Sequence, residues 1–356
     1  METVARSRPY TSRFTGGRRE TTGNIFMPLA RQRRTMVSTP PLESVTGADS
    51  LNDALADPGA SVAVIADPFA GREAALDRAE RALDGGDRTR VEPEGGPPSV
   101  GEEPLVVDDC HHLYARRVGG FDRIDAFLDR VAASSTQVVT SWNRYSWQYL
   151  DATRDVADPF HHVLSVPAMA SDRIADAIRA RNEPLPTFES PPSGHDSMFT
   201  AVTYEIPLPR RGPLSVEIPV VDIDYVSAWL GARDVPEPDA IVFERLERLS
   251  GGNLGVASAI WEQCVSGEAV VPDDLYRPVD RSFDPGDGAT EVLGVAVAKE
   301  AVTRDELAAV VPDVRLDRTL HSLADHGFLT VDDVVRLRPG GLPSALESLK
   351  RRRWQW

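Results

Sequence analysis

The chain has 356 residues, 41% of them hydrophobic, and a formal net charge of −16, so it can hold two or three domains, each with its own core. It contains no stretch of about 18 apolar residues, which excludes a transmembrane helix, and we expect a cytoplasmic protein. Two cysteines, Cys110 and Cys264, exclude a disulfide framework.

The first segment, residues 1–40, carries eight arginines and two acidic residues and has no sustained helical or strand period. We therefore expect it to be disordered. Two interpretations stay open. Either it is a basic arm that binds nucleic acid, or the start is mis-annotated and the protein begins at Met27 or Met36.

Strands and helices then alternate through residues 41–166. Apolar runs predict buried strands at 61–66, 105–107, 137–140 and 162–166. Helical spacing of apolar residues predicts helices at 73–83, 121–132 and 146–156. This alternation indicates right-handed crossovers and a four-stranded parallel sheet, hence an α/β fold.

The turn after the first of these strands has the position of a phosphate-binding loop. The usual pattern is G-x-x-x-x-G-K-[ST], and here the stretch reads Ala-Asp-Pro-Phe-Ala-Gly-Arg-Glu over residues 66–73. Gly71 matches, Arg72 replaces the lysine, and Glu73 replaces the hydroxyl that would bind Mg²⁺. Asp67 and Glu73 place negative charge near phosphates, and two unit charges ~5 Å apart repel by about 3 kcal/mol at an effective dielectric near 20.

Two further strands end in polar residues. Asp108 and Asp109 follow an apolar strand, as in a Walker B element, where the first carboxylate holds Mg²⁺ and the second orients water. Asn143 or Ser141, at the end of the next strand, could contact a γ-phosphate. Equally, these residues could cap the following helix.

Residues 60–265 together resemble the P-loop core and helical lid of AAA+/STAND ATPases. The resemblance implies a weak site for ATP and Mg²⁺, with phosphate contacts from Gly71, Arg72 and Glu73 and with Asp108 as the magnesium ligand. No arginine occurs from Gly251 to Val265, where the family places a second sensor. Arg144 and Arg154 are candidates for an arginine finger. The absence of the lysine, the hydroxyl and the sensor predicts a protein that does not turn ATP over.

The C-terminal part, residues 289–356, reads as a winged helix. Thr303 and Glu306 form a capping box, a helix is expected at about 314–326, and a hairpin follows around Asp332 and Asp333. The acidic residues disfavour DNA, and winged helices also dock proteins. The candidates for DNA contact are Arg315, Arg318, His321, Arg336 and Arg338.

Two local features have competing interpretations. Cys110 stands beside His111 and His112, but no second ligand pair follows at usable spacing, so we expect no zinc. Residues 349–356 combine four cations with two tryptophans, which suits an anionic membrane or nucleic acid. We favour the alternative, a helix end whose cations complement the helix dipole while Trp354 packs on the wing.

The predicted domains are therefore an arm (1–40), a degenerate P-loop core (41–166), a helical lid with a Pro-rich β elaboration (167–288) and a winged helix (289–356). Only two lysines occur against 37 arginines (39 basic residues minus 2), an acidic, arginine-rich composition like that of extreme halophiles. We expect a nucleotide-sensing or non-hydrolysing regulator or scaffold that binds a protein partner or a second copy. The alternatives are an active ATPase and a DNA-binding regulator.

Overall fold

The computed structural model describes residues 43–46, 50–83, 86–189, 199–206, 214–221, 237–265, 267–279 and 286–354. The predicted arm and the last two residues of the tail lie outside these ranges.

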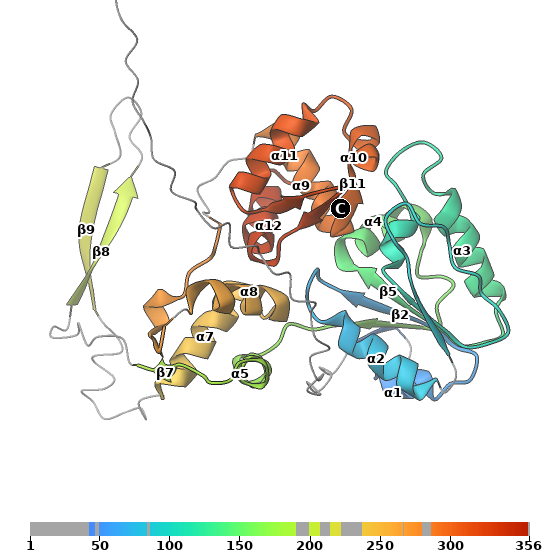
Figure 1. The fold of residues 1–356 in the computed structure, drawn as a ribbon, viewed down its shortest axis with the longest axis horizontal. Coiled ribbons are helices and arrows are strands. Elements are labelled where there is room, and N and C mark those ends of the chain that lie inside the picture. The colour runs from blue at the N-terminus through green and yellow to red at the C-terminus, as the bar shows by residue number, and fades with distance from the viewer. Residues whose placement is uncertain are drawn as a thin grey trace, which may run out of the picture. The chain divides into compact units, whose positions relative to one another are not determined.

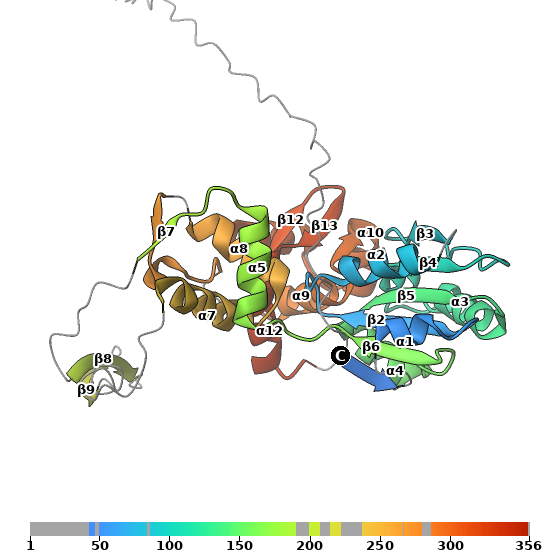
Figure 2. The same ribbon diagram turned by 90° about the horizontal axis from the view of Figure 1, so that it is seen from below.

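A six-stranded sheet has the strand order β1-β6-β2-β5-β4-β3 (Figure 2). Strands β6, β2, β5, β4 and β3 are parallel, and β1 pairs antiparallel with β6. The predicted α/β fold with a parallel sheet is confirmed. The strands are β1 (Glu43–Thr46), β2 (Ser61–Ala66), β3 (Asp87–Arg90), β4 (Leu105–Asp108), β5 (Val138–Asn143) and β6 (His162–Ser165).

Helices cover both faces of this sheet (Figure 1). Helices α1 (Leu51–Leu55) and α2 (Arg72–Ala82) share one apolar cluster with alternate residues of β2, such as Val62 and Val64. Helices α3 (Asp122–Ala133) and α4 (Arg144–Arg154) pack on the other face, against Ala63 and Ile65. Burial on both faces explains why these strands are continuous apolar runs.

The prediction of four strands was wrong, because the sheet has five parallel strands and an antiparallel one. Strand β3 consists of Asp-Arg-Thr-Arg, and none of its four residues is buried. It lies at the edge of the sheet, where it pairs with β4. Because its side chains are mostly exposed, it lacks the apolar run that revealed the other strands.

Residues 171–279 form the helical part, with α5 (Ser171–Arg181), α7 (Pro238–Ser250), α8 (Leu254–Cys264) and the short turn η2 (Pro272–Asp274). Two short strands, β7 (Thr187–Phe188) and β10 (Ala269–Val270), pair in parallel. The expected β elaboration is an antiparallel hairpin of β8 (Phe199–Ile206) and β9 (Leu214–Val221). The N-cap residue of α5 is Ala170.

Residues 287–354 form what we call the C-terminal module. Three strands pair antiparallel in the order β11-β13-β12. The elements are α9 (Asp287–Lys299), β11 (Ala301–Thr303), α10 (Arg304–Val310), α11 (Leu316–Asp325), β12 (Leu329–Val331), β13 (Val334–Leu337), η3 (Pro339–Gly341) and α12 (Leu342–Arg351).

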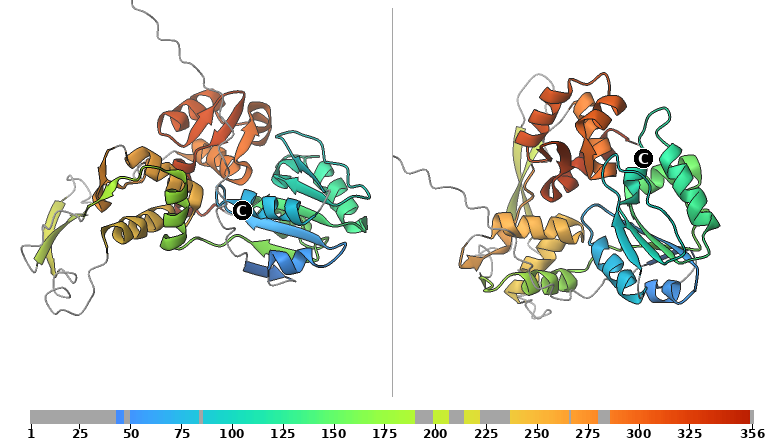
Figure 3. Two further views of the ribbon diagram at one scale, coloured as in Figure 1. Left: turned by 60° about the horizontal axis from the view of Figure 1, so that its bottom comes forward. Right: turned by 45° about the vertical axis from the view of Figure 1, so that its right-hand side comes forward.

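One apolar cluster joins the helical part to the C-terminal module (Figure 3). It includes Ile178 of α5, Phe243 of α7, Trp261 of α8 and Leu293 of α9, all 3% exposed or less. The two parts therefore share a core. Among the residues described, no helix is long and apolar enough to cross a membrane.

Candidate functional site

The carboxyl ends of β2, β4 and β5 lie side by side, because β5 pairs in parallel with both β2 and β4. The turn after β2 leads into α2 through Gly71, whose φ of 84° is in the left-handed region. A side chain at Gly71 would meet no atom within 4 Å, so the backbone conformation, not space, selects glycine. The loop after β2 and the two aspartates Asp108 and Asp109 thus lie together at the carboxyl ends of the parallel strands.

Arg72, the first residue of α2, is buried in an ionic cluster. Its guanidinium donates to both carboxylate oxygens of Glu300, at 2.6 and 3.1 Å, and to Asp109. Asp108 lies 3.8 Å from its Nε. Burial opposes the charge of Arg72, but Glu300 and Asp109 outweigh it, so the pKa of Arg72 is raised. The positive charge at the lysine position is therefore already neutralised by carboxylates of the protein.

The two aspartates at the end of β4, Asp108 and the following Asp109, are engaged as well. Asp108 accepts a hydrogen bond of 2.6 Å from Ser141 Oγ, and its other oxygen lies 3.4 Å from Arg88 and 3.3 Å from Arg90. Asp109 is 2.9 Å from Arg90 Nε on its second oxygen. Arg88 and Arg90 come from β3, the edge strand that the sequence pattern did not reveal.

Asn143 caps a helix, one of the two roles that the sequence left open, and it also contacts a carboxylate of the protein. Its side-chain oxygen accepts from the backbone amides of Tyr145 and Ser146, at 2.8 and 3.3 Å, and so caps α4. Its Nδ2 donates to Glu300 Oε1 at 3.0 Å and to the carbonyl of Val297 at 2.8 Å. The anion that Asn143 contacts is thus a side chain of the C-terminal module.

The other charged residues of this region pair with side chains other than Arg72. Glu73 has a side chain that is 64% exposed and lies 3.6 Å from Arg90. Asp67 pairs with Arg144 at 3.0 Å, and burial raises the pKa of Asp67 despite that arginine. Arg154 lies over the ring of Phe121 and 3.6 Å from Asp125. Both finger candidates, Arg144 and Arg154, therefore have partners within the chain.

Two hydrogen bonds also join the loop to the helical part, within residues 251–265, the segment in which the family places a second sensor. Asn253 Nδ2 donates to the carbonyl of Pro68 at 2.7 Å, and the Gly255 amide donates to the carbonyl of Phe69 at 3.0 Å. A Cβ at Gly255 would lie 2.5 Å from Cβ of Phe69, so only glycine allows this approach. Phe69 itself has a φ of 65°, a strained value for an aromatic residue.

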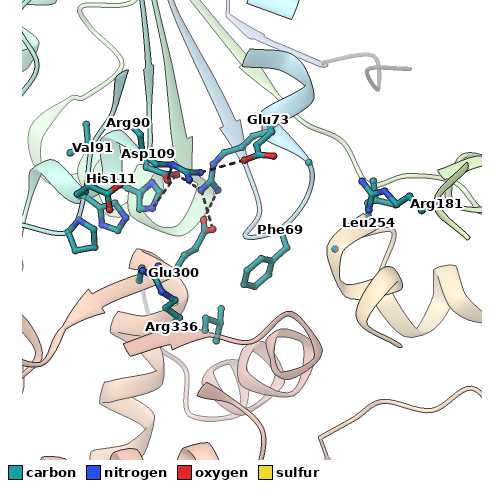
Figure 4. A pocket seen from close by; sticks show the side chains of 18 residues that line it. Phe69, Glu73, Arg90, Val91, Asp109, His111, Arg181, Leu254, Glu300 and Arg336 are labelled. Atoms are coloured by element: carbon teal, nitrogen blue, oxygen red, sulfur yellow. Dashed lines mark hydrogen bonds and ion pairs between the residues drawn. The ribbon is translucent and has the colours of Figure 1, made fainter. Parts of the chain in front are cut away.

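A pocket of about 540 Å³ opens beside the ionic cluster (Figure 4). Its walls come from the loop, β3, the turn η1 (Cys110–Leu113), α8 and the module strands. His111 and His112 line it, and burial lowers the pKa of both well below the usual value, which keeps them neutral. The charged side chains at its walls are Arg72, Glu73, Arg90, Glu92, Asp109, Arg181, Glu300 and Arg336.

The residues present do not fit ATP with Mg²⁺. Asp108 and Asp109 contact three arginines, so a magnesium ion would have to displace cations from both. Glu73 offers no hydroxyl, and Arg72 is occupied by carboxylates. Within the part of the chain that the structure describes, no three His, Cys, Asp or Glu side chains form a metal-binding group, and Cys110 Sγ contacts the carbonyl of Val107 at 3.6 Å.

The residues predicted to contact DNA fall into two groups. Arg315, Arg318 and His321 are exposed on or beside α11, where His321 lies 3.4 Å from Asp325. Arg336 of β13 and Arg338, just after that strand, are exposed as well, and Arg336 also lines the pocket (Figure 4). In the tail, Trp354 packs against α9, because a Cβ at Gly294 would lie 2.5 Å from its ring.

No family model and no curated protein matches this sequence. Among solved structures, the chain is similar to the ORC2 protein of Aeropyrum pernix, at 10% identity and a TM-score of 0.34 over 85% of this chain and 91% of that one. The RuvB Holliday junction branch migration motor of Thermotoga maritima gives 11% and 0.36, over 86% and 93%. A STAND protein with a tetratricopeptide repeat sensor from Pyrococcus horikoshii gives 10% and 0.35, over 88% and 43%.

Proposed function

We propose that this chain is an AAA+/STAND-like P-loop protein that does not hydrolyse ATP and acts as a regulator or scaffold through its C-terminal module. The observation that supports this proposal is the double engagement of Arg72 by Asp109 and Glu300. A phosphate-binding cation must be available to the ligand, and here two carboxylates compete for it. A site that cannot stabilise the charge of the transition state turns substrate over more slowly by orders of magnitude.

The module is a winged helix in this proposal. Its element order, helix–strand–helix–helix–hairpin, and the pairing of β11 with the hairpin β12–β13 support that assignment. Helix α11 would then be the helix that presents side chains to a partner.

Protein docking is the function that we favour for this helix. Asp317 and Asp325 share α11 with Arg318 and His321, so the surface carries both signs of charge and would repel a phosphate backbone in part. DNA contact is the second candidate, favoured by the exposure of Arg315 and Arg318. Arg336 lies on β13, apart from α11, on the wall of the pocket.

Phosphate release from Mg-ATP tests the main proposal. The wild-type chain should release no more phosphate than the Asp109→Asn variant, in both low and molar salt. Release above that background, removed by Asp109→Asn, would restore the ATPase interpretation.

DNA retention tests the second candidate. Binding by the wild-type chain should be compared with that of the double variant Arg315→Ala and Arg318→Ala over a range of salt concentrations. If both arginines bind phosphates, each substitution should reduce the slope of log affinity against log salt by about one. Equal retention by the two chains would remove this candidate.

A further inference from the structure

Glu300 stands at an unusual point of the chain. It follows the last residue of α9 and has φ 58° and ψ −43°, a conformation that non-glycine residues rarely adopt. Such a strained conformation persists where the surrounding structure fixes it. The backbone therefore holds this carboxylate in a particular place, and that place is the phosphate-type loop.

The donors around Glu300 match those of an oxyanion site. Arg72 binds the carboxylate through two nitrogens, at 2.6 and 3.1 Å, and Asn143 Nδ2 donates to it at 3.0 Å. Arg72 is one of the residues for which the resemblance implied phosphate contact, and Asn143 is one of the two candidates for contact with a γ-phosphate. We infer that Arg72 and Asn143 form an oxyanion site whose internal ligand is the Glu300 carboxylate, and that a phosphate group competes with Glu300 for it. This inference rests on the proposed function, because a loop that turned over Mg-ATP would need the site vacant.

The core holds the end of α9 so that Glu300 stays in place. Ser146 Oγ donates to the carbonyl of Ala298 at 2.5 Å, and Asn143 donates to that of Val297. Lys299 donates to the carbonyls of His111, at 2.9 Å, and of Tyr114. A carboxylate tethered in this way competes at an effective concentration of about millimolar or higher, so a free phosphate ligand would bind the wild-type chain weakly.

The chemistry of the competing ligand follows from the site. A guanidinium fork with an amide donor recognises carboxylate and phosphate oxygens alike. The pocket of about 540 Å³ leaves room beside the cluster, and Arg336 lies on its wall. His111 is fully buried there, and neither ring nitrogen has a hydrogen-bond partner among the residues described. A neutral histidine has one N–H to donate, which a phosphate oxygen can accept.

Removal of the internal ligand tests this inference. Thermal stability of the wild-type chain and of Glu300→Ala should be measured against inorganic phosphate, with sodium chloride adjusted to hold ionic strength constant. Glu300→Ala should respond to phosphate at a concentration about tenfold or more below that needed by the wild type. The double variant Arg72→Ala, Glu300→Ala should lose that response. Glu92→Ala is the matched control, since Glu92 is an exposed carboxylate of the same pocket, and it should behave as the wild type.

A second arm separates free phosphate from a nucleotide. ATP and ADP with EDTA, in place of phosphate, show whether the rest of a nucleotide adds affinity. Equal phosphate responses of the wild type and Glu300→Ala would overturn the inference. If Glu300→Ala does not fold, Glu300→Gln removes the same charge at nearly constant volume. Its thermal response to phosphate is then compared with that of the wild type in the same way. Phosphate release from Mg-ATP by the wild type would instead sink the proposed function, so the two failures are distinguishable.

Discussion

The C-terminal module meets the rest of the chain through two surfaces of opposite character. Towards α5, α7 and α8 it shares an apolar cluster that contains Phe243, Trp261 and Leu293. Towards the α/β core it makes polar contacts: Glu300 with Arg72, Lys299 with backbone carbonyls, and Thr303 Oγ1 with Glu94 at 2.8 Å.

The difference teaches which parts of the chain can separate. Apolar contact is strengthened by salting-out salts and offers water or ions no competing partner. For the polar contacts, in contrast, water and dissolved anions offer competing hydrogen-bond partners once the surface opens. We therefore expect the helical part and the module to stay together, and the α/β core to be the part from which they can release.

The largest loss of stability should follow from truncating a large side chain of the apolar cluster. Trp261 is 3% exposed and stacks on Phe243, with ring centroids 5.7 Å apart. Trp261→Ala should lower the free energy of unfolding by about 3–5 kcal/mol, because it leaves a cavity. Chemical denaturation measures this. Tyr276→Ala is the control, since Tyr276 is 54% exposed and should change stability by about 0.5 kcal/mol or less. A similar loss for both variants would contradict a shared core.

Breaking the buried ion pair of the polar surface should be nearly as severe. Lys299 is 2% exposed and lies 3.2 Å from Glu306, which is 3% exposed. Lys299→Met leaves that carboxylate buried without its cation and should cost about 3 kcal/mol. The only other lysine, Lys350, is exposed, so Lys350→Met should be neutral. Addition of Glu306→Gln to Lys299→Met should recover part of the loss. Without such recovery, the pair does not explain the effect.

Asn143→Ala should have an intermediate effect. It removes the α4 cap and leaves the carbonyl of Val297 without its donor, so we expect a loss of about 1–3 kcal/mol. Asn182→Ala is the comparison, because Asn182 Nδ2 also donates to a carbonyl, that of Ile178 at 2.8 Å, but at a partly exposed helix end. Thermal unfolding distinguishes them. If Asn143→Ala and Asn182→Ala lowered stability equally, the hydrogen bond from Asn143 to Val297 of α9 would not contribute to stability.

The smallest effect concerns pH. Burial lowers the pKa of Lys299 to about 8 from an ordinary value of 10.5, against the opposing influence of Glu306. Between these values the unfolded chain holds a proton that the folded chain has released, so stability should rise with pH. We expect a gain of about 1 kcal/mol between pH 8 and 9 that is absent in Lys299→Met. Denaturation at fixed salt over that interval measures it, and an unchanged slope in the variant would assign the rise to another group.

The sequence predicted the parts of the site that lie next to apolar runs. Gly71, Asp108 and Asn143 each follow a buried strand, so their common location at the sheet edge could be inferred. Arg88 and Arg90 were missed because β3 has no apolar run. Glu300 was missed for a different reason. It lies 228 residues from Arg72 along the chain, and no local pattern reports a contact over that separation.

The scarcity of lysine gives this molecule a built-in reporter. Lys350 is exposed, whereas the Lys299 amine lies against the carbonyls of His111 and Tyr114. An acylating reagent that modifies primary amines would therefore modify Lys350 and leave Lys299 intact while α9 stays on the core. Acylation of Lys299, counted by mass spectrometry, would record each departure of the helix from that surface without any engineered label.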